Sequence, residues 1–95
     1  MTHFVLVHGA WHGSWCWERL VPQLTSRGHR ATAVDVAWHD GDLAFTDHAE
    51  ALAAACPDEE FVLVGHSLAA CLVPLVPFLR PEATAVVMLC GIVPN

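Results

Sequence analysis

The stretch FVLVGHSLAACL, residues 61–72, joins an unbroken apolar run to a series of helix-forming residues through a single serine. The run at 61–64 is rich in β-branched residues and does not alternate with polar ones. This pattern is typical of a parallel strand that is covered on both faces. The small and straight-chain residues after Ser67 favour a helix. The stretch therefore predicts a strand-to-helix turn at Ser67.

Similar apolar runs recur along the chain, and segments with helical spacing separate them. The three further runs are FVLV (4–7), TAVDV (32–36) and TAVVML (84–89). The order is strand–helix three times, followed by a fourth strand, and right-handed crossovers turn this order into an open parallel sheet. We predict an α/β fold of about four strands with helices on both faces. If the first strand is central, the spatial strand order is 2-1-3-4.

The helical segments carry their own start and stop signals. Apolar residues within 17–24 follow the spacing of an amphipathic helix, and Gly28 stands where a C-cap glycine would. The segment 49–56 repeats the spacing, with Thr46 as a plausible N-cap. The third helix comes after the serine and should be split near Pro74, because proline removes a helix hydrogen bond.

Topology brings the two most chemically suggestive loops together. In open parallel sheets a ligand crevice lies at the carboxyl ends of the strands, where the strand order reverses. In the predicted order the reversal falls between the first and third strands. The loops that leave them are HGAWHGSW (8–15) and GHSLAA (65–70). We expect a binding crevice between these loops.

The pattern around the serine is that of a nucleophile turn. A sharp turn that lifts a serine hydroxyl clear of the sheet brings its neighbours two residues away close together, so both must be small. Gly65 and Ala69 meet this requirement. The amide of Leu68 would then point at an oxyanion formed near Ser67, with the Ala10 amide as a second donor. The alternative interpretation of Ser67 is a helix N-cap.

Three stretches together resemble the α/β-hydrolase fold, and most closely its branch of plant-type methylesterases, hydroxynitrile lyases and bacterial relatives. They are FVLVHGAWHGSWCW (4–17), RATAVDV (30–36) and VLVGHSLAA (62–70). The resemblance covers the whole chain but only strands three to six of an eight-stranded domain. It implies that Ser67 is the nucleophile and that Ala10 and Leu68 supply oxyanion amides. Residues 1–95 would form a single, incomplete α/β-hydrolase domain.

The chain departs from this family in its residues beyond the serine. The family's acid and histidine come after later strands, but no histidine comes after Ser67 here and Glu82 is the only later acid. A serine without an adjacent base is a weak nucleophile. Loss of a triad member leaves roughly 10³–10⁴-fold acceleration over water. We expect an esterase-like enzyme for small apolar esters or acyl compounds that is weakly active or inactive alone.

Two other functions remain open. The fourth strand and its adjoining cysteine, TAVVMLC (84–90), would form an exposed apolar edge, and such edges pair readily. A second copy of the chain or a separate C-terminal half could cover this edge and complete an enzyme. Alternatively, the chain is a non-catalytic module that binds a hydrophobic ligand or a partner protein in the same crevice.

Aromatic residues near the crevice are candidate substrate contacts. Trp11, next to the proposed oxyanion amide, is the best pocket residue, and His66 in the serine turn is a second. Trp15 and Trp17 could line the same pocket, although core or helix-packing roles suit them at least as well.

We expect no metal and no cofactor. His8 and His12 lie four residues apart in a glycine-containing loop without an evident third ligand. A substitute base for Ser67 drawn from His8, His12 or His39 is not expected. Asp35 lies at the end of the second strand, as a ribose-binding acid would, but no G-x-G-x-x-G comes after the first strand.

Composition restricts the partners further. The chain has a net charge of −6, and all four of its basic residues are arginines that form no cluster. Nucleic acid and anionic membranes are therefore not expected as partners. The N-terminus has no pattern of a signal peptide, and the four cysteines are widely spaced, so we expect free thiols and a cytoplasmic location.

Overall fold

The computed structural model describes residues 1–10, 12–38, 41 and 43–89 of the chain. The elements are β1 (His3–Val7), η1 (Ser14–Trp17), α1 (Leu20–Ser26), β2 (Arg30–Val34), α2 (Phe45–Ala55), β3 (Phe61–His66), α3 (Ala69–Leu72), η2 (Val73–Leu75), α4 (Val76–Leu79) and β4 (Ala83–Leu89). The strands form one sheet in the order β2-β1-β3-β4, and every neighbouring pair is parallel. The predicted fold class and strand order are confirmed.

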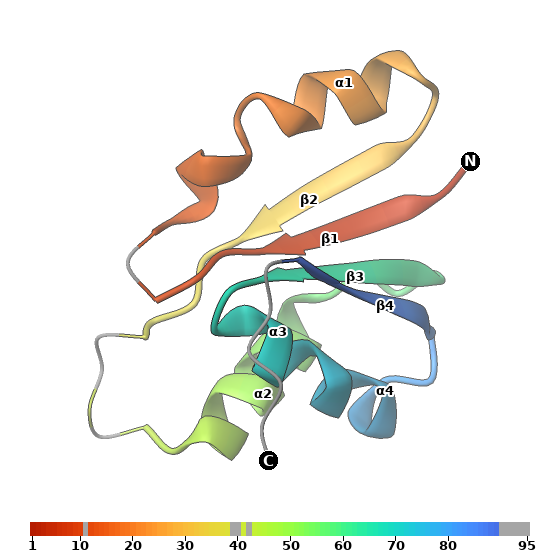
Figure 1. Ribbon diagram of the computed structural model, residues 1–95. Coiled ribbons are helices and arrows are strands. Elements are labelled where there is room, and N and C mark those ends of the chain that lie inside the picture. The colour runs from red at the N-terminus through yellow and green to blue at the C-terminus, as the bar shows by residue number, and fades with distance from the viewer. Residues whose placement is uncertain (11, 39–40, 42, 90–95) are drawn as a thin grey trace.

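Helices cover the two faces of the sheet unequally, as Figure 1 shows, with α1 on one side and α2, α3 and α4 on the other. The face towards α2, α3 and α4 holds the main core, which includes Phe61, Leu63 and Leu72. The opposite face holds a smaller cluster in which Trp17 packs on Leu6 and Val64. The strongly apolar runs of β1 and β3 therefore bury side chains on both faces, as central parallel strands do.

The second strand ends two residues earlier than the run TAVDV predicts. β2 ends at Val34, which pairs with Val7, the last residue of β1. Beyond this pair the N–H of Val36 donates to the imidazole Nε2 of His8, at 2.8 Å. The side chain of His8 replaces the backbone of β1 as the acceptor, so the chain leaves the sheet there.

The first predicted helix is broken into η1 and α1. A continuous helix from Trp17 would require residue 22 to donate to the carbonyl of Glu18, but residue 22 is proline. Proline lacks this N–H and its ring clashes with that carbonyl, so it is tolerated only in the first turn of a helix. Accordingly, η1 ends at Trp17 and α1 restarts at Leu20.

The end of α1 agrees with the glycine signal. Gly28 has a φ of +84°, its N–H donates to the carbonyl of Thr25, and the N–H of His29 donates to that of Leu24. This pair of hydrogen bonds is the Schellman motif, which favours glycine because the left-handed backbone is strained for other residues. The expected C-cap glycine is confirmed.

The two later helices differ in how well the sequence predicts their ends. Thr46 is not the N-cap of α2, because the helix begins at Phe45 and Ala44, two residues before Thr46, takes the cap position. Asp47 stabilises this end instead, as its carboxylate accepts a hydrogen bond of 2.8 Å from the Ala44 N–H. The split near Pro74 is confirmed, since η2 separates α3 from α4 there.

No helix within the described residues has the length and apolar character needed to cross a membrane. Cys16 and Cys56 are free cysteines, and Cys56 is buried. Burial raises the pKa of the Cys56 thiol to about 11, so it stays protonated at neutral pH.

Candidate functional site

Ser67 lies in a tight turn between β3 and α3. It is the non-glycine residue with positive φ in the described part of the chain, at 58°, a conformation that costs about 1–3 kcal/mol at such a residue. The Ser67 N–H donates to the carbonyl of Leu89 at the end of β4, at 3.0 Å, and its carbonyl accepts from Ala70. These two hydrogen bonds hold the turn, and the Ser67 residue remains half-buried.

Glycines make this turn sterically possible. A Cβ atom added at Gly65 would lie 2.7 Å from the carbonyl oxygen of Ala69, so β3 and the start of α3 approach too closely for a side chain at position 65. A Cβ at Gly9 would lie 3.1 Å from the Cβ and 3.6 Å from the Oγ of Ser67. Gly9 therefore lets the loop after β1 run directly beside the serine.

The two candidate oxyanion donors lie next to this contact. Ala10 comes after Gly9 in a turn that the His12 N–H closes on the Gly9 carbonyl, at 3.2 Å. Leu68 directly precedes α3. The N–H groups of Ala10 and Leu68 make no hydrogen bond to another described residue. Their role as oxyanion donors stays a prediction.

Asp35 anchors the far end of the same loop. Its carboxylate accepts hydrogen bonds from the N–H of Ser14 at 2.7 Å and from the hydroxyl of Ser14 at 3.0 Å. It also lies 3.7 Å from the Nε2 of His8. From the sequence, the role considered for Asp35 is that of a nucleotide-binding acid. Its position at the carboxyl end of β2, beside β1, is the signal that could have indicated a loop anchor.

The pKa of Asp35 is expected to report this anchor. The Ser14 N–H, and then the Ser14 hydroxyl, hold the pKa of the carboxyl below its ordinary value. We predict that Ser14→Ala raises the pKa of Asp35 part of the way back, because the backbone bond persists. Titration monitored by carboxyl carbon NMR shifts measures this change, and an unchanged Asp35 pKa in Ser14→Ala would contradict it.

The lowered pKa of Asp35 also makes the stability of the fold depend on pH. Because the folded-state pKa is depressed, Asp35 stabilises the fold above its unfolded pKa of about 3.9. This contribution is lost as the pH falls through the lower folded pKa. Ser14→Ala should therefore flatten the acid limb of the stability curve, which denaturation at several pH values can measure.

The aromatic candidates differ in burial and in position. Trp17 is buried, only 6 % exposed, in the core cluster beneath η1, whereas Trp15 is 61 % exposed and has no core role. His66 is half-buried at the end of β3, and its ring lies edge-on to that of Trp17, with 6.4 Å between centroids. Trp11 and His39 lie outside the described residues.

The histidines of the first loop, His8 and His12, make contacts within the fold. The described residues contain no group of three or more side chains able to hold a metal ion. His8 is buried, its Nδ1 donates to the Gly9 carbonyl at 2.7 Å, and its Nε2 accepts from Val36. Both ring nitrogens are therefore used within the fold, in the neutral form. No imidazole or carboxylate of a described residue is hydrogen-bonded to Ser67.

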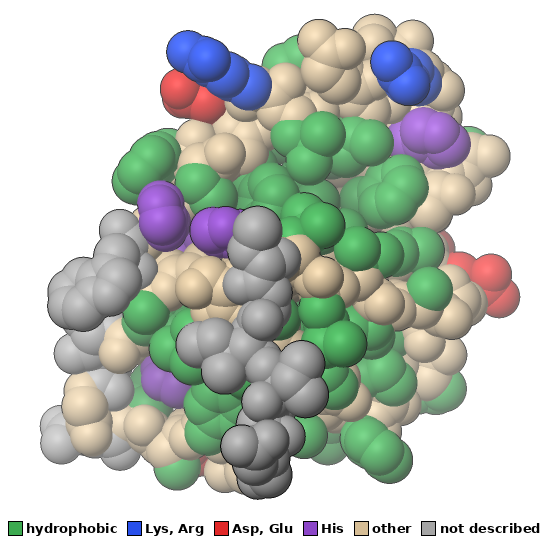
Figure 2. Space-filling model, viewed as in Figure 1, with side chains coloured by type: hydrophobic (Ala, Val, Ile, Leu, Met, Phe, Trp, Pro, Cys, Tyr) green, Lys and Arg blue, Asp and Glu red, His purple; other side chains and the backbone are tan. Residues whose placement is uncertain are grey.

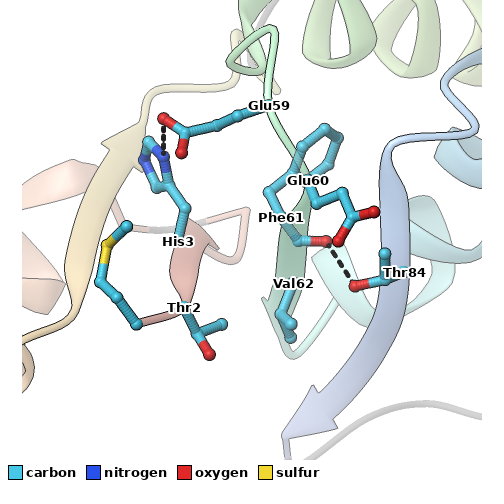
Figure 3. A pocket seen from close by; sticks show the side chains of 8 residues that line it. Thr2, His3, Glu59, Glu60, Phe61, Val62 and Thr84 are labelled. Atoms are coloured by element: carbon cyan, nitrogen blue, oxygen red, sulfur yellow. Dashed lines mark hydrogen bonds and ion pairs between the residues drawn. The ribbon is translucent and has the colours of Figure 1, made fainter.

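A separate cavity of about 260 Å³ lies at the opposite edge of the sheet, where β1 and β3 begin (Figure 3). The Nδ1 of His3 is 3.3 Å from a carboxylate oxygen of Glu59, and its Nε2 is 2.6 Å from the Thr32 hydroxyl. The hydrogen bond from His3, together with nearby Arg30, lowers the pKa of Glu59. All the strands are parallel, so they begin at this edge of the sheet and end at the other. The cavity therefore lies at the opposite end of β3 from Ser67.

An open parallel sheet with a strained serine at a strand-to-helix turn defines the α/β-hydrolase class of protein. A family model described as the alpha/beta hydrolase family matches residues 4–95. The chain belongs to this family.

Relatives agree with this assignment. The probable esterase PIR7A of rice (Oryza sativa) is 48 % identical over 77 residues, which cover 70 % of this chain and 29 % of the rice protein. Methylesterase 3 of Arabidopsis thaliana is 45 % identical over 78 residues, covering 70 % of this chain and 30 % of the relative. The crystal structure of polyneuridine aldehyde esterase matches 100 % of this chain and 42 % of its own, with a TM-score of 0.83 and 34 % identity. The chain thus spans less than a third of the rice and Arabidopsis relatives.

Proposed function

We propose that this chain is the nucleophile-bearing part of an esterase that acts on small apolar esters or related acyl compounds. The observation that carries the proposal is the strained backbone of Ser67, held in place between β3, α3 and the glycine of the neighbouring loop. Strain of this kind persists where the surrounding structure enforces it, and it concentrates at functional sites. The esterase names of the matched relatives support the choice of substrate class.

The proposed chemistry is acyl transfer. The Ser67 hydroxyl attacks the ester carbonyl and forms a bond to its carbon, while the carbonyl oxygen takes up negative charge. The N–H groups of Ala10 and Leu68 donate hydrogen bonds to that oxygen, and each such donor is worth roughly 10²–10³ in rate. Collapse of the intermediate breaks the ester carbon–oxygen bond and expels the alcohol, which takes up the proton that Ser67 lost, and water then hydrolyses the acyl-serine. His66 and Trp11 would contact the acyl group.

The proton of Ser67 needs a base, which the described residues do not supply. We propose that a further polypeptide segment, corresponding to the C-terminal part of the relatives, brings an imidazole and a carboxylate to the serine. The match covers 42 % of the polyneuridine aldehyde esterase chain, so more than half of that relative lies outside it. With this segment absent, the serine keeps only the oxyanion and binding contributions.

The structure offers a surface for this segment at β4, the edge of the sheet beside Ser67. On the face of the sheet that carries α1, η1 and α1 contact β1 and β2. The side chains of β4 on this face are therefore exposed, namely Ala85, Val87 and Leu89. In the view of Figure 2, hydrophobic side chains gather across the middle of the molecule.

Reactivity of Ser67 tests the enzymatic proposal. We expect a fluorophosphonate probe to label the folded chain slowly, and the label to disappear in Ser67→Ala. Ser26→Ala, at an exposed serine of α1, is the matched control and should leave labelling unchanged. Intact-protein mass spectrometry reads the adduct. Folded wild-type chain that takes no label would reject the nucleophile and leave the non-catalytic binding module as the better function.

Sedimentation distinguishes completion by a second copy from completion by another segment. A chain that stays monomeric at high concentration rules out self-pairing through β4. The free Cys16 and Cys56 support a reducing location such as the cytoplasm, which we propose for this chain.

A further inference from the structure

Aromatic rings link the loop that carries Ala10 to the serine turn. The ring of His12 lies 5.7 Å from that of His66, centroid to centroid, with an interplanar angle of 75°. On its other side it lies 5.6 Å from the ring of Trp15. His66 directly precedes Ser67 in the chain. The His12 side chain therefore connects the loop after β1 to the turn after β3.

Both partners of His12 make further contacts. His66 is edge-on to Trp17, which is buried in the core cluster. The Trp15 ring lies back over Gly13, where an added Cβ would be only 2.9 Å from its Cδ1 and Nε1. His12 is thus a middle member of a chain of four rings that begins and ends in η1.

The backbone of His12 is tied to the same structure. Its N–H closes the turn on the Gly9 carbonyl, and Ala10 lies within this turn. Gly9 contacts Ser67 at one end of the loop, and Ser14 is bonded to Asp35 at the other. Between these two anchors, the exposed side chain of His12 places its ring against that of His66, the residue before Ser67.

We propose that His12 is a positioning residue that sets the Ala10 N–H relative to Ser67 through its ring contact with His66. The inference rests on the proposed function for its catalytic consequence, but the geometry can be measured without activity. His12 makes this contact by its shape as a flat ring, so another aromatic side chain should replace it.

The test compares His12→Ala with His12→Phe in the full chain. A pair of packed rings stabilises the loop enough that its loss should be measurable. We expect the protection of the residue 12 amide against hydrogen exchange to fall about 3- to 10-fold. Residue-resolved NMR, corrected for the intrinsic rate of each side chain, measures this protection factor. His12→Phe should restore it. His29→Ala is the matched control, because the His29 ring also has an edge contact, with Phe4 at 5.5 Å, but lies outside this loop.

Labelling of Ser67 supplies the second readout. If the wild type reacts with a fluorophosphonate, His12→Ala should slow the reaction about 3- to 10-fold, and His12→Phe should recover it. An unchanged protection factor in His12→Ala overturns the proposal, as does a His12→Phe protein that behaves like His12→Ala. A wild type that never reacts rejects the esterase proposal alone, because the exchange measurement still decides the role of His12.

Discussion

Phe61→Ala is expected to destabilise the fold by about 3–5 kcal/mol, the usual loss when a buried phenylalanine is truncated to alanine. Phe61 is only 1 % exposed at the start of β3, in the main core cluster. The Arg80 guanidinium also lies over its ring, 5.6 Å from the centroid. Domains of this size have little stability to lose, so much of the variant should be unfolded at 37 °C. Urea denaturation monitored by tryptophan fluorescence measures the change.

Phe78 provides a control of the same residue type in the same chain. It lies in α4 and is 87 % exposed. Phe78→Ala should therefore alter the free energy of unfolding by no more than about 0.5 kcal/mol. Equal losses in the two variants would show that the core does not lie where β3 meets α2 and α4.

The second large effect is expected from Gly65→Ala. The new Cβ would lie 2.7 Å from the carbonyl oxygen of Ala69 and 2.9 Å from a methyl of Val73. Because the nearest atom belongs to the backbone, the clash is relieved only if α3 moves away from β3. Overpacking of this kind costs about 1–3 kcal/mol, and we expect the upper end. The shift would also displace Ser67, so its labelling should fall with the stability.

Gly41→Ala is the matched control. A Cβ at Gly41 meets no atom within 4 Å, and its φ lies outside the positive range that disfavours side chains. Its free energy of unfolding should stay within about 0.5 kcal/mol of the wild type. A Gly65→Ala protein as stable as Gly41→Ala would contradict the tight turn on which the proposed nucleophile depends.

The close approach of Gly65 to Ala69 explains why the sequence predicts the serine turn. Steric exclusion at positions 65 and 69 acts between residues close in the chain, so it leaves a local pattern around Ser67. The split at Pro74 and the cap at Gly28 are local in the same sense. Pro22 carried an equally local signal against a continuous first helix, and the apolar spacing of 17–24 obscured it.

The sequence by itself determined the alternation of strands and helices, the parallel order of the sheet and the place of Ser67 in it. Each of these results from apolar periodicity, residue size and the handedness of crossovers, which need no knowledge of distant contacts. Only the tertiary structure decided what holds the loop beside the serine. Asp35 meets Ser14 across 21 residues, and the ring of His12, in the loop after β1, meets that of His66 at the end of β3. Such pairs depend on the register of neighbouring strands and on side-chain direction, which no local pattern encodes.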